Sequence, residues 1–169
     1  MKVRDAADKI VGFIKAQFPM PESDGDMEPA LFVFRDGSEE IALVPIGMFL
    51  TSDHGKDGLA ALIRTLMRNT MVSYVIYVAE AWMIKVQREE GLPEAHIPEG
   101  GLKNHPDREE AFFVEAYGRE ECVTVNIPII RKDGQRTLGE PTYITDRDGE
   151  QEGRFSPRNI VPPPQGTVH

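Results

Sequence analysis

The chain contains very little cysteine: position 122 holds the single one among 169 residues. One thiol excludes an internal disulfide and any zinc site built on cysteines. Because Cys122 lies in an alternating strand pattern, we expect it to be a small buried apolar residue. One thiol without a bridge also fits a reducing compartment, so we expect a cytoplasmic protein.

Long hydrophobic runs are missing as well. The longest, residues 74–79, is far shorter than the roughly 18 residues that span a bilayer. The first residues include acids and lack the cleavage site of a signal peptide. The signatures of phosphate-loop, dinucleotide-binding and hydrolase-elbow proteins are absent. These absences predict a protein with no membrane segment and no cofactor.

Basic residues are in deficit, with 19 Lys and Arg against 28 Asp and Glu and a net charge of −9. This balance argues against nucleic-acid binding, which requires cations to neutralise phosphates, and against adhesion to an anionic membrane. The acids concentrate in residues 21–50 and 86–121, and each segment carries a net charge of −6. Both segments are either solvated loop surface or a docking face for a basic partner.

Two amphipathic helices are predicted. Residues 3–18 place apolar side chains at helical spacing, and Pro19 and Pro21 end this segment. A second helix follows Ser52 or Asp53, either of which can cap it. Its apolar stripe has the i, i+3, i+4, i+7, i+8 spacing and consists of Leu59, Leu62, Ile63, Leu66 and Met67.

The remaining apolar segments have the composition of β-strands. A hairpin is predicted around Asp36 and Gly37 between 30–35 and 40–46. The long segment 71–86 is almost continuously apolar, which is typical of a central strand covered on both faces. Two further hairpins are predicted around Gly118 and around Asp133 and Gly134, from the segments 111–117, 121–131 and 136–145.

This order of elements predicts an α+β fold. Short links between successive strands favour an antiparallel sheet of about five or six strands with both helices packed on it. We expect residues 1–147 to form one domain. Residues 148–169 are rich in proline and glycine, without periodicity, and are predicted to form an extended or disordered, flexible tail.

Two acids stand where core residues are expected, Glu80 in the long strand and Glu115 in the next one. If these strands pair, the acids could lie on one face beside Trp82. Such a carboxylate pair in an apolar setting would have at least one raised pKa, which suits acid–base chemistry. Alternatively, a neighbouring arginine neutralises either acid; the candidates are Arg119, Arg131 and Arg136. For Trp82 itself, a core position is favoured over the edge of a pocket.

A divalent metal is the other chemical possibility, at the start of the second helix. Asp53, His54 and Asp57 lie within about one turn there. However, Asp and Ser are ordinary helix caps, and three ligands from one turn make a poor complete site. No metal is therefore expected.

The segment A-E-A-W-M at 79–83, followed by P-D-R-E-E-A at 106–111, resembles a pattern in small uncharacterised bacterial and phage proteins. In that family an "EAW" strand precedes a proline-rich loop and a second strand. The family has no assigned activity, so the resemblance implies one structural unit that contains Glu80, Trp82, Arg108 and Glu110. Within this unit we expect Arg108 to pair with Glu80 and hold the loop over the strand.

Two functions are compatible with these features. The first is a bacterial or phage accessory protein, a non-enzymatic interaction module that binds a protein partner through an acidic surface and self-associates through exposed sheet edges. The second is a small enzyme or ligand-binding protein with a carboxylate site at Glu80 and Glu115. A catalytic pair must be reachable by solvent, whereas a structural acid should be closed off by an arginine.

Overall fold

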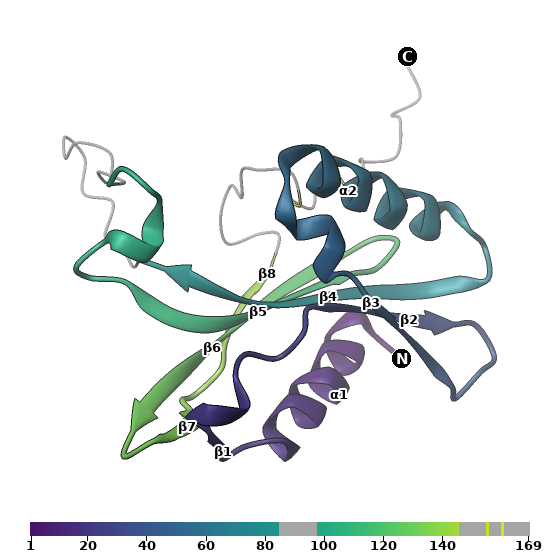
Figure 1. Ribbon diagram of the computed structural model, residues 1–169. Coiled ribbons are helices and arrows are strands. Elements are labelled where there is room, and N and C mark those ends of the chain that lie inside the picture. Colours follow the sequence, from purple (N-terminus) through teal and green to yellow (C-terminus); the bar gives the residue numbers. More distant parts are fainter. Residues whose placement is uncertain (85–97, 146–154, 156–159, 161–169) are drawn as a thin grey trace, which may run out of the picture.

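The computed structural model describes residues 1–84, 98–145, 155 and 160 (Figure 1). Residues 85–97, before the strand predicted at 111–117, and most of the tail predicted at 148–169 therefore lie outside the described residues. The helices are α1 (Val3–Ala16) and α2 (Asp53–Arg68), with short 3-10 turns η1 (Glu22–Asp24), η2 (Gly47–Thr51) and η3 (Leu102–Asn104).

The described strands form one antiparallel eight-stranded sheet in the order β1-β7-β6-β5-β4-β2-β3, with β8 also paired to β6. Their bounds are β1 (Met20–Pro21), β2 (Ala30–Arg35), β3 (Ile41–Pro45), β4 (Val72–Met83), β5 (Glu109–Tyr117), β6 (Cys122–Lys132), β7 (Gln135–Leu138) and β8 (Thr142–Thr145). The predicted α+β class and the two helices are confirmed, and β4 is central, as predicted.

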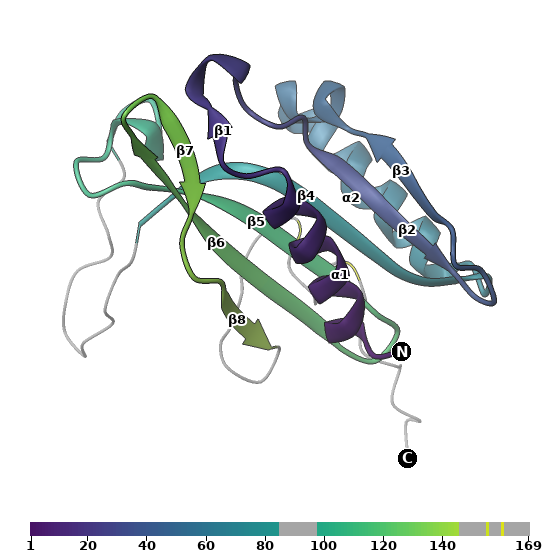
Figure 2. The same ribbon diagram turned by 90° about the horizontal axis from the view of Figure 1, so that it is seen from below.

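The sheet is curled, and each helix covers one of its faces (Figures 1 and 2). The strands from β6 to β1 bend toward α1, so that α1 lies inside the curve. Side chains alternate along β4: Ile76 and Val78 pack in the cluster with α1, while Val75 and Tyr77 pack in the cluster with α2. The α1 cluster is the larger of the two and takes six buried side chains from that helix.

The number of strands differs from the prediction for two local reasons. The strand predicted at 136–145 divides into β7 and β8 at residues 139–141, which contain Pro141 and face Pro128 of β6; neither proline has an N–H to donate. The carbonyl of Pro128 accepts the N–H of Gly139 at 2.8 Å, and the pairing register with β6 shifts by one residue there. The other difference is β1, which is too short to give a sequence signal and pairs with β7.

The start of α2 is as predicted. The side chain of Ser52 accepts the N–H of Gly55 at 3.0 Å and caps the helix. Within the described part of the chain, no helix combines the length and hydrophobicity that crossing a membrane requires.

Candidate functional site

A cluster of charged side chains lies inside the curve of the sheet, where residues 22–27 cross its strands. At its centre is Arg136 of β7, whose side chain is fully buried. Its Nη2 lies 2.6 Å from Oε1 of Glu80 on β4, and its Nη1 donates to the carbonyl of Gly25 at 2.7 Å. The N–H of Met27 donates to the same oxygen of Glu80 at 2.9 Å. Arg136 thus joins β4, β7 and the loop after β1.

Glu80 is nearly buried, with 8% of its side chain exposed. Burial raises its pKa. The hydrogen bonds from Arg136 and from the N–H of Met27, together with the charge of Arg136, counteract this rise in pKa only in part. Its second oxygen, Oε2, has no hydrogen-bond partner among the described residues. Glu80 is thus paired with an arginine, which is one of the two alternatives left open by the sequence.

A second arginine closes the outer side of the cluster. Arg131 of β6 binds Glu110 of β5 with two 2.7 Å bonds, from Nε and Nη2 to the two carboxylate oxygens. Arg131 also lies 3.4 Å from Asp26 and 4.0 Å from Glu22. The carboxylate of Glu110 raises the pKa of Arg131, so the arginine stays charged.

The cluster also contains the described residues' only trio of potential metal ligands. Carboxylate oxygens of Asp26, Glu80 and Glu110 lie within 4.8 Å of one another. However, Nη2 of Arg136 lies within 4.0 Å of an oxygen of each of these acids. Because the guanidinium already lies among the three carboxylates, the arrangement supports an internal ion network rather than a metal site.

Glu80 and Glu115 do not form a pair, so the possibility that they share a face is wrong. Glu80 is opposite Phe112, whose side chain packs in the α1 cluster, whereas Glu115 is opposite Tyr77 in the α2 cluster. The two acids therefore point to opposite faces of the sheet. One residue of register determines this outcome, because alternate side chains face opposite sides.

Glu115 is 2% exposed and has a cross-strand partner that the sequence did not suggest. Thr124 of β6 lies directly opposite, and its hydroxyl is 2.9 Å from both carboxylate oxygens. The charge of Glu115 adds to burial in raising the pKa of Tyr77, to about 12, and that of Tyr117. This polar group lies under apolar side chains, inside the α2 cluster.

Trp82 and Arg108 also differ from the prediction. Trp82 is 41% exposed, so a core position is wrong, because this end of β4 extends beyond the helices. Arg108 does not reach Glu80. Its guanidinium lies 5.1 Å from the centre of the Trp82 ring, and its Nη1 donates to the carbonyl of His105 at 3.2 Å. Arg136, and not Arg108, is the arginine that pairs with Glu80.

The candidate metal ligands at the start of α2, Asp53, His54 and Asp57, are all exposed. Asp53 lies 4.0 Å from Lys56 in an ion pair on the helix surface. These three residues are not among the carboxylates that the described structure groups at metal-binding distance.

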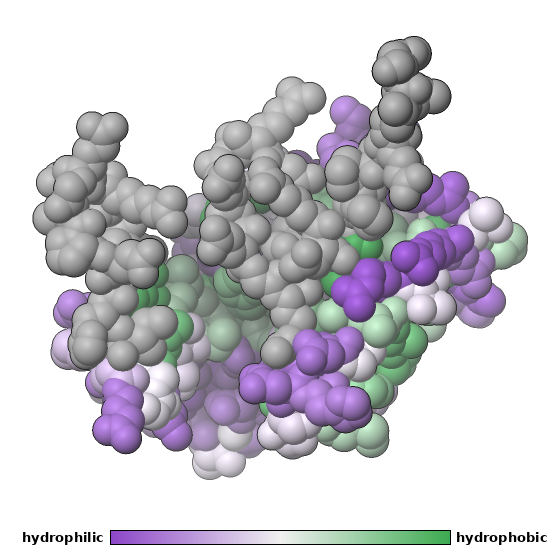
Figure 3. Space-filling model, turned by 90° about the horizontal axis from the view of Figure 1, so that it is seen from above, coloured by the Kyte–Doolittle hydropathy of each residue, from purple (hydrophilic) through white to green (hydrophobic). Residues whose placement is uncertain are grey.

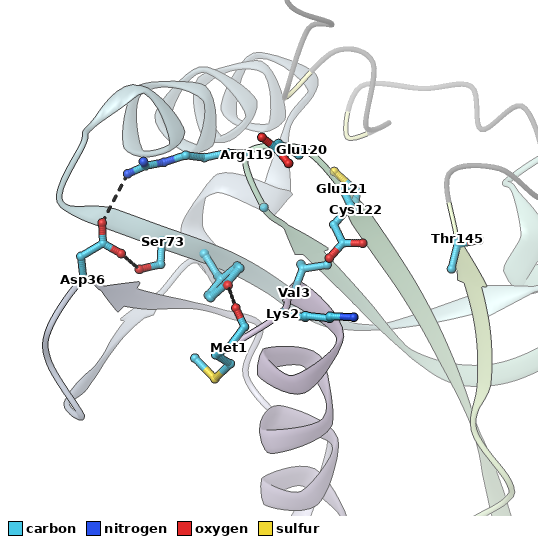
Figure 4. Close-up of a pocket in the computed structure, with 12 residues that line it drawn as sticks. Met1, Lys2, Val3, Asp36, Ser73, Arg119, Glu120, Glu121, Cys122 and Thr145 are labelled. Atoms are coloured by element: carbon cyan, nitrogen blue, oxygen red, sulfur yellow. Dashed lines mark hydrogen bonds and ion pairs between the residues drawn. The ribbon is translucent and has the colours of Figure 1, made fainter.

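A surface cavity of about 900 Å³ lies at the N-terminus of α1 (Figure 4). Its wall carries both charge signs, including Lys2 and Arg119 against Asp36 and Glu121. Several of these polar groups already have partners. Arg119 donates to the carbonyl of Thr70 at 2.6 Å and lies 3.5 Å from Asp36. Mixed charge and internal pairing give this cavity no preference for one ligand class.

The β2–β3 hairpin forms a different kind of surface at the edge of the sheet. All five residues of β3 are exposed, although most of them are apolar. Three exposed acids bracket the strand. Glu39 and Glu40 precede it. Glu28 lies beyond the other end of β3, beside Gly47, where its carboxylate oxygen is 3.7 Å from the position that a Cβ atom would take. We call β3 with these three acids the β3 edge.

Hydrophobic and hydrophilic residues also lie side by side on the face of the sheet that carries α2 (Figure 3).

Comparison with protein families, curated proteins and solved structures found no match to this chain. The argument for function therefore depends on the geometry described above.

Proposed function

We propose that this chain is a bacterial or phage accessory protein that acts in the cytoplasm as a non-enzymatic interaction module. It binds a basic partner protein through the β3 edge. The resemblance of 79–83 and 106–111 to small bacterial and phage proteins supports the origin. The observation that carries the function is an exposed apolar edge strand between exposed acids.

The ion pairs separate the acids of this edge from several others in the first acidic segment. Of the seven acids in segment 21–50, Glu22, Asp26 and Asp36 lie within 4.0 Å of Arg131 or Arg119, and Asp24 is the one further acid outside the β3 edge. The acids of the β3 edge are exposed and have no ion pair with a described residue. Uncompensated charge on one edge steers an oppositely charged partner toward it.

The alternative, a carboxylate site shared by Glu80 and Glu115, loses its geometric basis. The two acids face opposite sides of the sheet, and each is almost completely buried. A catalytic pair must reach the same substrate and be accessible to it. The interaction module is therefore the better supported function.

Selection from a random peptide library displayed on phage tests the proposal. We expect enriched peptides to combine apolar residues with Lys or Arg, and to lose binding to a variant with Glu28→Lys, Glu39→Lys and Glu40→Lys. The matched control changes the same amount of charge at exposed acids elsewhere, with Asp107→Lys, Glu120→Lys and Glu140→Lys. No enrichment, or equal loss in both variants, would contradict binding at the β3 edge.

A further inference from the structure

The backbone of β3 has one side available for a further strand. β3 pairs with β2 along its full length and with no other described strand. It ends the sheet on this side, as Figure 2 shows. The other edges of the described sheet include β1, which has two residues, one of them Pro21, and β8, which has four residues and pairs only with β6 among the described strands. Of these edges, β3 is the longest and therefore the best template for another strand.

The pairing register identifies the backbone groups that point outward. The N–H of Ile46 donates to the carbonyl of Pro29 at 3.0 Å, next to the pair formed by Ala30 and Pro45. Along an antiparallel ladder, hydrogen-bonded pairs alternate with pairs that are not hydrogen-bonded to each other. Val44 and Ala42 therefore face β2. The outward groups belong to Ile41, Leu43 and Pro45, and Pro45 is tolerated there because its missing N–H breaks no bond to β2.

The side chains beside these outward groups are apolar and accessible. Leu43 is 53% exposed and Ile41 39%, on the face of the sheet that carries α1. Phe13 of α1 is 43% exposed and contacts Phe32, the cross-strand partner of Leu43, edge to face. Alternate apolar side chains of an added strand would continue this surface.

Charge complementarity identifies the kind of strand. An added antiparallel strand would have Glu39 and Glu40 near one of its ends and Glu28 near the other. A strand with Lys or Arg at both ends matches this arrangement. The ion pairs would form at an exposed rim, where they contribute mainly to the association rate and to specificity.

A second copy of this chain fits less well. If two copies paired around Leu43, Ile41 of one would face Pro45 of the other, and the proline would leave one bond of that pair unmade. The acids that precede β3 in one copy would also approach Gly47 and Glu28 of the other. Like charges placed opposite each other are destabilising.

We infer that the β3 edge binds an extended segment of the partner by strand addition, through the backbone of Ile41, Leu43 and Pro45. The bound segment alternates apolar residues and has basic residues at its ends. This inference rests on the proposed function and specifies its partner. Backbone bonds supply affinity in this mode, and side-chain contacts and charge supply selectivity.

The test uses a synthetic peptide of alternating valine and threonine with two lysines at each end. We expect it to bind and to slow hydrogen exchange at the amides of Ile41 and Leu43, while the β2-facing amides of Ala42 and Val44 change less. The same peptide with N-methyl groups on alternate residues keeps its charge and side chains but loses donors. It should bind about tenfold more weakly or worse. Leu43→Pro should have a similar effect, with Leu43→Val as its control.

The outcomes separate the inference from the proposed function. If the peptide fails to bind, or binds without protecting Ile41 and Leu43, strand addition is wrong. Equal binding of the N-methylated peptide would also overturn it. In each case the library selection decides independently whether the acids of the β3 edge bind basic peptides. Concentration-dependent protection of the same amides without peptide would instead identify a second copy as the occupant.

Discussion

Oε1 of Glu80 lies 2.6 Å from Nη2 of Arg136, and this contact connects the central strand β4 to β7 near the opposite edge of the sheet. Both side chains are at least nine-tenths buried. Two buried charges are costly to remove from water, and each needs the other to remain in the interior. Removing one partner therefore leaves an uncompensated charge in the interior.

Arg136→Met should lower the free energy of unfolding by about 3–5 kcal/mol, because it leaves Glu80 buried without its cation. Arg131→Met is the control. Arg131 is 39% exposed, and its loss should cost about 1 kcal/mol. Combining Arg136→Met with Glu80→Leu should recover most of the stability, since neither charge then remains. Urea unfolding measures all three. A single Arg136→Met variant as stable as the parent would show that the pair is unimportant.

Thr124→Val should lower the free energy of unfolding by about 1.5–3 kcal/mol. The valine preserves the shape of the side chain but removes the hydroxyl that lies 2.9 Å from both oxygens of Glu115. Thr124→Ser keeps the hydroxyl and should cost less. The comparison is again made by urea unfolding. If serine and valine prove equally destabilising, packing and not the hydrogen bond is the function of Thr124.

The tyrosines should resist ionisation until the protein unfolds in alkali. Burial and Glu115 raise the pKa of Tyr77 to about 12, and burial and Asp8 raise that of Tyr143 to about 12. An unfolded tyrosine ionises near pH 10. The stability linked to these groups is therefore fully present below about pH 10 and decreases as pH rises toward 12. Tyrosinate absorbance should appear together with the loss of circular dichroism. Absorbance that rises near pH 10 in a folded protein would contradict these values.

Arg108→Ala should leave the fold almost unchanged, with a cost of about 1 kcal/mol or less. Arg108 lies over an exposed tryptophan and not against a buried acid, and cation–π contacts at exposed sites are weak. The fluorescence of Trp82, the only tryptophan, should nevertheless change, because its ring becomes more accessible to water. Iodide quenching measures this. A loss of several kcal/mol would restore Arg108 as the residue that holds this part of the fold.

Local signals in the sequence were sufficient for most elements. The apolar stripe of α2, the cap at Ser52 and the turn at Asp36 and Gly37 each depend on a few neighbouring residues. The division of the predicted strand 136–145 has a local component, since the break at 139–141 contains Pro141, and a long-range one that was not predictable in the same way. The long-range component depends on Pro128, which faces that strand only after β6 has paired with it.

The candidate site shows the same difference between local and long-range information. The unusual burial of Glu80 and Glu115 could be read from their apolar neighbours. Their separation onto opposite faces could not, because the relation between the two strands depends on a single residue of register. The partner of Glu80 was likewise open among several arginines until the curl of the sheet brought Arg136 to it.

The sequence by itself determined that this is an α+β protein with two amphipathic helices, an antiparallel sheet and excess acid in two segments. Periodicity, turn residues and composition act over short distances and are fixed before the chain folds. Only the tertiary structure decided which acids are neutralised internally and which remain exposed at the β3 edge. That division depends on distances between residues far apart in the chain, which only the packing of the whole sheet defines.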